Sequence, residues 1–426
     1  MTNIKDLNLE DEIVPLFNYT YNDFSKEFLI HILTHPLSSK DEIINRQLVL
    51  KSFIANHNIL SNYSYSRLDL LEVHAFLAYS NKEVFTKGLK LKFFLSETIR
   101  HQTSRKYIQT ILLFHRLNSY YFKRIETRLF PENYKSELQS LNEFFNSFNL
   151  NHYEKLIQDQ KFKASHVIEL ATLIFQKAKQ GEFEIFWKRF FSFEANLSLS
   201  IGITKQKLSF PTMSETSFSL HDFFHPLLKN PVKNSFSTNQ NVILLTGPNM
   251  SGKSTFLKAV SLCIYLGHIG VGIPASKGEM PFFNSISVLI NLNDNILSGY
   301  SHFMTEVLNL KSVVVQAAGK SKCFAVFDEI FRGTNIEDAV EISTTTIKGL
   351  SSFKNSIFFI STHLHQLKQL EEVISGKVDT LYLDCELKGK MPLFNYQLKK
   401  GWSDLKVGQI LFESEGLNSM LSVRRE

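Results

Sequence analysis

The sequence predicts an all-helical domain over residues 1–214, followed by an α/β domain over residues 215–426. Only three of the 18 glycines precede residue 240, and glycine is costly inside helices but useful in tight loops beside ligands. Apolar residues in the first half recur at spacings of three and four, as in residues 68–77, which is typical of amphipathic helices. In the second half, short apolar runs each end in polar residues, which is typical of buried strands that lead into a site.

The composition excludes several classes of protein. Hydrophobic residues make up 43% of the 426 residues and charged residues 21%, so global disorder is excluded. The three cysteines lie far apart without a CxxC pair, which argues against a disulfide scaffold or a structural zinc module and fits a cytoplasmic protein. The N-terminus does not resemble a secretory signal, and we expect no membrane span. The net charge of +6 permits a nucleic-acid partner.

The boundary between the two domains is expected near residue 215, where the helical pattern stops. Proline disfavours helix in the residue before it, so Phe210-Pro211 and His225-Pro226 predict non-helical connections. The polar segment 230–239 predicts a loop.

The first chemical motif is GPNMSGKS, which fits the phosphate-loop pattern GxxxxGK[ST]. It follows a predicted buried strand at 242–245 and precedes a predicted helix from residue 255. In such a loop the backbone N–H groups and the helix N-terminus surround phosphate oxygens, the Lys253 ammonium reaches the β- and γ-phosphates, and the Ser254 hydroxyl binds magnesium. The predicted nucleotide-contacting residues are Gly247, Pro248, Asn249, Met250, Ser251, Gly252, Lys253, Ser254 and Thr255. The alternative is a glycine-rich turn that binds nothing.

Two further apolar runs end in reactive side chains. Residues 324–327 are followed by Asp328 and Glu329, and we expect Asp328 to hold magnesium and Glu329 to accept a proton from the attacking water. Residues 358–361 lead to His363, which we expect to hydrogen-bond the γ-phosphate or that water. The carboxyl ends of neighbouring parallel strands meet at one edge of a sheet, where ligands bind. A metal pair of His363 with His365 is the weaker alternative, because no acidic or cysteine ligand is close in sequence.

A polar segment at 293–301 precedes a predicted helix. Helix N-termini attract anions, so this segment, which includes Ser301, could receive the phosphate of a nucleotide held by a partner subunit. An ordinary capped helix is an equal alternative.

These motifs together resemble the ATPase domain of the MutS family of DNA mismatch repair proteins, a branch of the ABC-type ATPases. The resemblance rests on GPNMSGKSTFLKAV, FAVFDEIFRGTN and STHLHQL, in this order, and SGYSHFMTE is similar to the family's signature loop SGRSTFMxE. The segments at 33–47 and 186–195 resemble the start and end of the family's helical core, or lever, domain. The resemblance therefore implies an α/β P-loop ATPase domain of ABC type preceded by an all-α lever domain.

The resemblance implies a mechanism for this sequence. Two ATPase domains would pair head to tail in a homodimer, and each would bind ATP with Mg²⁺. Asn249, Lys253 and Ser254 would contact phosphate and metal, His363 would sense the γ-phosphate, and Ser301 would reach across the dimer. Closure driven by ATP would move the levers, which embrace DNA in the family. The resemblance therefore implies an Mg²⁺-dependent, DNA-binding ATPase of the DNA repair type.

The sequence also departs from the family pattern. It begins at the lever-like segment and ends soon after the ATPase motifs, so we expect no mismatch-reading domain, clamp domain or C-terminal helix-turn-helix. Phe331 replaces a usual glycine, and Tyr300 and His302 replace Arg and Thr in the signature loop. Val232 falls near the place of the aromatic residue that stacks on adenine, and Phe236 is a possible substitute.

Two hypotheses of different classes follow. In the first, the chain acts on DNA, contacted by basic residues of the helical half that alternate with aromatics. These residues are Lys87, Lys90, Lys92, Arg100, Arg105, Lys106, Arg116, Lys123 and Arg124, with Phe93, Phe94, Tyr120 and Tyr121 among them. Solvated helix faces over buried aromatics are the simpler explanation of that pattern. In the second hypothesis, ATP gates dimerisation and the partner is a protein. A transport ATPase is disfavoured, since no LSGGQ-type loop occurs.

Overall fold

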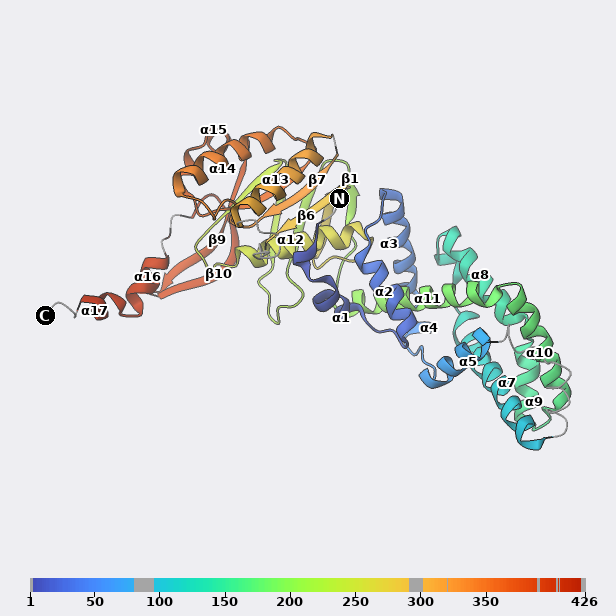
Figure 1. Cartoon of the computed structure of the whole chain (residues 1–426). Coiled ribbons are helices and arrows are strands. Elements are labelled where there is room, and N and C mark those ends of the chain that lie inside the picture. Colours follow the sequence, from blue (N-terminus) through green and yellow to red (C-terminus); the bar gives the residue numbers. More distant parts are fainter. Residues whose placement is uncertain are drawn as a thin grey trace. The chain divides into compact units, whose positions relative to one another are not determined.

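The computed structural model describes residues 3–79, 96–290, 302–319, 321–388, 391–403, 405 and 407–422. The chain forms two compact units (Figure 1). Unit 1 comprises Met1–Leu16, Leu33–Ile44 and Lys205–Glu426, and unit 2 comprises Phe17–Ile32 and Asn45–Thr204. The units are discontinuous in sequence, because two N-terminal segments belong to the α/β unit. The domain division near residue 215 stays a prediction.

The N-terminal half is helical, as the spacing of its apolar residues predicts. Its elements are α2 (Asp23–Thr34), α3 (Lys40–Ala55), α4 (His57–Leu60), α5 (Arg67–Tyr79), α7 (Glu97–Leu117), the π-helix η3 (Asn118–Phe122), η4 (Thr127–Leu129), α8 (Glu132–Asn146), α9 (Leu150–Gln158), α10 (Ala164–Lys179) and α11 (Glu182–Lys205). Aromatic rings fill the core between them, and Phe114, Phe145 and Phe190 are completely buried. Phe144 stacks on Phe186 with ring centroids 4.1 Å apart. Such pairs add to the stabilisation that burial itself provides.

One carboxylate is buried in the core of unit 2. Glu194 on α11 accepts hydrogen bonds from Asn22 Nδ2 at 2.6 Å, Ser25 Oγ at 2.5 Å and Tyr63 OH at 2.8 Å. Burial raises the pKa of Glu194, although these donors oppose that shift. The donors come from residues far apart in sequence, so the carboxylate joins the start of α2, the loop before α5 and α11.

Unit 1 contains a six-stranded sheet and a four-stranded sheet. The six-stranded sheet has the order β10-β9-β4-β8-β7-β6, and the four-stranded sheet has the order β1-β5-β2-β3. The strands are β1 (Thr212–Ser214), β2 (Phe218–Phe223), β3 (Asn234–Thr238), β4 (Val242–Thr246), β5 (Lys277–Pro281), β6 (Ser285–Leu289), β7 (Cys323–Phe327), β8 (Ile357–Ser361), β9 (Asp379–Lys388) and β10 (Met391–Lys400). Strands β6, β7, β8, β4 and β9 run parallel, and β10 pairs antiparallel to β9.

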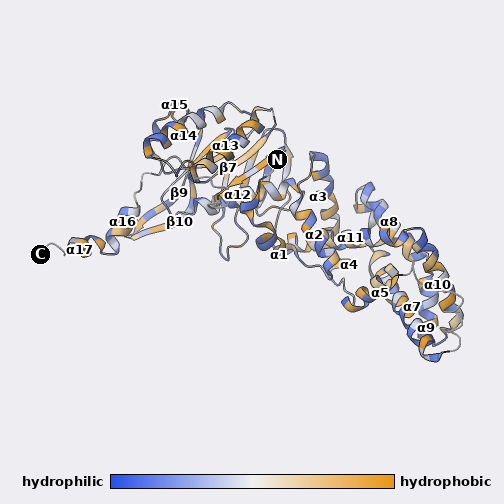
Figure 2. Ribbon diagram, viewed as in Figure 1, coloured by the Kyte–Doolittle hydropathy of each residue, from blue (hydrophilic) through white to orange (hydrophobic). Residues whose placement is uncertain are grey.

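The larger sheet is covered on both faces. Helices α13 (His302–Ala318) and α14 (Ile336–Ser351) share one apolar cluster with alternate residues of the central strands, such as Val242 and Leu244 of β4. Ile243 and Leu245 of the same strand are equally buried, so they face the layer that contains α12 (Lys253–His268). Every residue of β4, β6, β7 and β8 is buried, which explains the nearly continuous apolar sequences of β4, β7 and β8 (Figure 2). The prediction of an α/β unit with a helical N-terminal region is thus confirmed.

The order of the strands positions the predicted motifs. Strand β8 lies between β4 and β7, and all three strands are parallel. The segments that follow them therefore leave the sheet at the same edge. Among the described residues, no helix is long and apolar enough to span a membrane.

Candidate functional site

The loop between β4 and α12 has a backbone that requires glycine. Gly247 and Gly252 have φ angles of +134° and +93°, which side chains rarely adopt. A Cβ on Gly247 would also lie 3.0 Å from Ser251 Oγ, and a Cβ on Gly252 would lie 3.1 Å from a ring carbon of Tyr396. Helix α12 begins at Lys253, so its free N–H groups face the loop.

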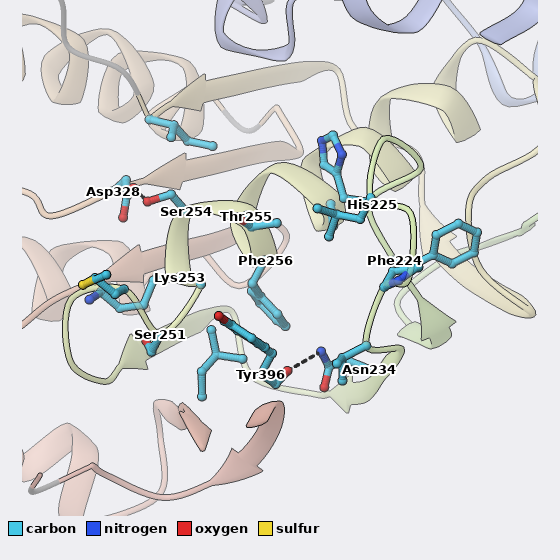
Figure 3. Close-up of a pocket in the computed structure, with 18 of the residues that line it drawn as sticks. Phe224, His225, Asn234, Ser251, Lys253, Ser254, Thr255, Phe256, Asp328 and Tyr396 are labelled. Atoms are coloured by element: carbon cyan, nitrogen blue, oxygen red, sulfur yellow. Dashed lines mark hydrogen bonds between the residues drawn. The ribbon is translucent and has the colours of Figure 1, made fainter. Parts of the chain in front are cut away.

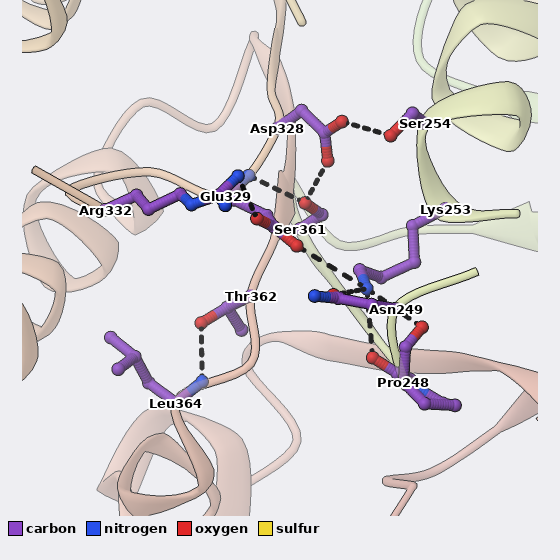
Figure 4. A network of polar contacts seen from close by, with 11 residues as sticks. Pro248, Asn249, Lys253, Ser254, Asp328, Glu329, Arg332, Ser361, Thr362 and Leu364 are labelled. Atoms are coloured by element: carbon purple, nitrogen blue, oxygen red, sulfur yellow. Dashed lines mark hydrogen bonds and ion pairs between the residues drawn. The ribbon is translucent and has the colours of Figure 1, made fainter. Parts of the chain in front are cut away.

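Lys253 is held at the centre of this loop. Its side chain is only 5% exposed, and its ammonium donates to Gly247 O at 3.0 Å and Pro248 O at 3.1 Å (Figure 4). Burial lowers the pKa of Lys253, while the carboxylates of Glu329 and Asp328 oppose the shift. The ammonium is thus a buried cation whose partners in its own loop are neutral carbonyls, which suits it to an incoming anion.

Asp328 follows β7 and meets two serine hydroxyls. Ser254 Oγ donates to Asp328 Oδ2 at 2.5 Å, and Ser361 Oγ donates to Asp328 Oδ1 (Figure 4). The Ser361 hydroxyl also accepts a hydrogen bond of 2.8 Å from the N–H of Glu329. Sequence analysis missed Ser361, the last residue of β8, and the only signal for it is a hydroxyl at the end of an apolar strand.

Glu329 lies between two cations. Its Oε1 is 3.7 Å from Lys253 Nζ, and its Oε2 is 3.3 Å from Arg332 Nη1. Glu329 has a φ of +52° and Phe331 a φ of +63°, so the turn after β7 contains two left-handed residues that are not glycine. The Phe331 ring is buried and lies 6.1 Å, centroid to centroid, from the ring of Phe303 on α13. This packing fixes the turn that carries the Glu329 carboxylate.

A cavity of about 980 Å³ opens beside the phosphate-loop motif (Figure 3). Its walls include residues 249–256, Asp328, Glu329 and Tyr396, together with Phe224, His225, Val232 and Asn234. Burial lowers the pKa of His225, which favours its neutral form. The volume and the mixed lining suit a ligand with both a charged and an aromatic part.

The structure shows which of the two residues near the expected adenine position lines the cavity. Phe236 packs in the core, with its ring 5.5 Å from that of Phe218, and does not line the cavity, so it is not a substitute. Val232 does line it. Sequence analysis missed Tyr396, which lies on β10 where the register with β9 shifts, with a φ of +54°. Asn234 supports this bulge by donating to Tyr396 O at 3.0 Å.

Of two other predicted site residues, His363 lies within the described residues and Ser301 does not. His363 is exposed and lines a second cavity of about 370 Å³, together with Asn249, Glu329 and Arg332. It therefore lies near the Glu329 carboxylate but outside the wall of the larger cavity. His365 faces Trp402, and the indole Nε1 is 3.4 Å from its Nδ1. Ser301, predicted to reach a partner's nucleotide, lies outside the described residues.

The fold and the site place the chain in a known class. Residues 243–418 match the family model described as MutS domain V. Together with the mixed α/β layers and the helical N-terminal region, this match defines an α/β ATPase domain preceded by helices.

Relatives in sequence point to the same family. The DNA mismatch repair protein MutS of Listeria welshimeri is 29% identical over 338 residues, which cover 74% of this chain and 38% of the relative. The proteins of the same name from Persephonella marina and Bacillus licheniformis are 28% and 32% identical, over 80% and 46% of this chain. The match covers 38% of the Listeria protein, 40% of the Persephonella protein and 23% of the Bacillus protein, so the chain spans about two fifths of the length of these relatives or less. The match to MutS domain V and these relatives support membership of the MutS family.

Proposed function

We propose that the chain binds ATP with Mg²⁺ in the cavity of about 980 Å³ and hydrolyses it. One observation carries the proposal: the Lys253 ammonium, the Ser254 hydroxyl and the Asp328 carboxylate, from distant parts of the sequence, meet at one edge of a parallel sheet. A buried cation beside free helix N–H groups suits phosphate. The adjacent aromatic wall suits a base.

The residues beside Lys253 fit a magnesium ion. Ser254 Oγ and Asp328 Oδ2 are hydrogen-bonded to one another, so two hard oxygen ligands already lie side by side. Ser361 holds the other carboxylate oxygen and so fixes the orientation of Asp328. When bound, magnesium would neutralise charge on the phosphates. Residues 247–255, except Pro248, which has no N–H, would surround those phosphates with backbone N–H groups.

We assign proton acceptance from water to Glu329, which lies next to Asp328 on the same turn. In the structure its carboxylate lies within ion-pair distance of Lys253 and Arg332. An anion that engages Lys253 would weaken the first of these contacts and free one carboxylate oxygen for water. We propose that His363, which lines the second cavity with Asn249 and Glu329, senses that anion. For the base, we propose that Tyr396 stacks on adenine opposite the wall formed by Val232 and His225.

The relatives are named as DNA mismatch repair proteins. We therefore propose that the chain acts on DNA in a repair pathway, as a homodimer in which Ser301 contacts the nucleotide of the other subunit. The alternative is a nucleotide-gated dimerisation switch for a protein partner.

ATP turnover by the full chain tests both parts of this proposal. Phosphate release is measured alone and with homoduplex, mismatched and four-way-junction DNA. Lys253→Ala is expected to lose nucleotide binding, whereas Lys258→Ala, on the same helix but outside the cavity lining, serves as the matched control. Glu329→Gln is expected to bind ATP and not to turn it over. Normal affinity in Lys253→Ala would contradict the site, and turnover that ignores every DNA would favour the protein-partner alternative.

A further inference from the structure

Two arginines converge on one exposed aromatic ring in unit 2. The guanidinium carbons of Arg116 and Arg124 lie 6.0 Å and 5.5 Å from the centroid of the Tyr120 ring, within cation–π range. The Tyr120 side chain is 55% exposed. We call these three residues the Arg–Tyr–Arg cluster; it lies where α7 passes into the π-helix η3.

The local backbone explains why Tyr120 points outward. Tyr121, the next residue, is buried: its hydroxyl donates to Asn62 O at 2.8 Å and accepts from the N–H of Ser64 at 3.0 Å. Phe122 is buried as well. The wide turn of a π-helix changes which residues face the core, and such turns often mark functional sites. Because Tyr121 and Phe122 are buried, Tyr120 lies on the surface.

Hydrogen bonds to Ser64 and Ser119 order the two guanidinium groups. Arg116 donates from Nε to Ser64 O at 2.9 Å and from Nη2 to Ser64 Oγ at 3.0 Å. Arg124 donates from Nε to Ser119 O at 3.1 Å. A guanidinium has five N–H groups, so most of its donors stay available on each arginine. Because the backbone already orders the side chains, binding an anion costs less conformational entropy.

Among the described residues of unit 2, no carboxylate pairs with the two arginines of the cluster. Over the ranges that the structure describes, neither Arg116 nor Arg124 forms an ion pair with a carboxylate. Arg67 and Arg128 of the same unit do so, with Asp23 at 2.7 Å and Glu126 at 3.0 Å. Within the described part of the chain, the cluster therefore presents an aromatic face and two ordered cations that are hydrogen-bonded but not paired with a carboxylate.

We propose that the Arg–Tyr–Arg cluster binds the sugar-phosphate backbone of a nucleic-acid strand; the inference rests on the proposed action on DNA and names a contact surface for it. The planar guanidinium group of an arginine can donate two parallel hydrogen bonds to the oxygens of one phosphate. An exposed ring between two forks suits a strand in which phosphates alternate with planar bases and sugars. An acidic peptide would satisfy the arginines but offers no counterpart to the tyrosine face. Binding is then independent of sequence and sensitive to salt.

The test compares the affinity of the full chain for labelled single-stranded and duplex DNA at several salt concentrations, by fluorescence anisotropy. The double variant Arg116→Gln/Arg124→Gln removes both charges, and we expect its slope of log affinity against log salt to fall by about two. Tyr120→Ala is expected to weaken binding about tenfold, and Tyr120→Phe to restore it. Arg128→Gln is the matched control, because it removes one arginine charge nearby that Glu126 already neutralises.

The possible outcomes distinguish a failure of the Arg–Tyr–Arg cluster from a failure of the proposed action on DNA. A double variant that is folded by circular dichroism and binds DNA with an unchanged salt slope would overturn the inference and leave the action on DNA standing. A wild-type chain that hydrolyses ATP but binds neither DNA would overturn both. An equal loss in Arg128→Gln would show a diffuse charge effect and overturn the assignment to the cluster.

Discussion

Replacing Phe331 by glycine sets two opposing effects against each other. Phe331 has a φ of +63°, and a left-handed conformation costs an L-residue about 1–2 kcal/mol. Glycine, the usual residue at this position in the sequences that the motif resembles, adopts this conformation without cost. Judged by the backbone alone, the substitution would stabilise the protein by about that amount.

The buried ring outweighs this gain. Phe331 is 1% exposed and packs against Phe303, and removing a buried phenylalanine ring costs about 3–5 kcal/mol. The difference predicts that Phe331→Gly loses about 2–3 kcal/mol of unfolding free energy. For a unit of this size the loss corresponds to a decrease in Tm of about 5–10 °C. Phe331→Ala has no ring and keeps the strain, so it is expected to lose about 1–2 kcal/mol more than glycine.

Thermal unfolding of the three proteins measures these differences, and hydrogen exchange in β7 assigns them to unit 1. The expected order of stability is wild type, then Phe331→Gly, then Phe331→Ala. A glycine variant as stable as the wild type would show that the ring contributes nothing. An alanine variant as stable as glycine would show that the left-handed turn carries no strain.

Three further predictions concern the site and unit 2. Ser361→Ala removes the hydroxyl that orients the Asp328 carboxylate, which we propose binds magnesium. The magnesium concentration for half-maximal ATP turnover should therefore rise about tenfold. An unchanged magnesium titration would contradict this role of Ser361. Gly252→Ala puts a Cβ on a residue whose φ is +93° and brings it against the ring of Tyr396. Nucleotide affinity, measured by fluorescence titration, should therefore fall more than about tenfold. Gly349→Ala is the control, because a Cβ at Gly349 meets nothing within 4 Å. Burial raises the pKa of Glu194, so the folded protein keeps this proton to higher pH than the unfolded chain, and stability falls as pH rises from the ordinary carboxyl value through the folded pKa. Urea unfolding of Glu194→Gln should show a flatter decline than the wild type over that window, and an identical slope would exclude this carboxylate as its source.

Local patterns predicted much of the site. The strand β4, the glycine loop and helix α12 are neighbours in sequence. The predicted Asp328 and Glu329 directly follow β7, and the predicted His363 lies two residues after the end of β8. Short-range sequence determines such units because φ preferences and burial periodicity act within a few residues. Ser361, Arg332 and the cavity wall at Tyr396 were not predicted, because their roles depend on which strands are neighbours.

The sequence by itself determined the chemistry available at each strand end and the helical character of the first half. The tertiary structure alone decided which aromatic residues face a ligand or solvent. Phe236 is in the core while Tyr396, far along the chain, lines the cavity. Tyr120 and Tyr121 are adjacent and chemically identical, yet one is exposed and the other is buried against Asn62 and Ser64. The physical reason is that burial depends on contacts between residues distant in sequence, which local preferences do not encode.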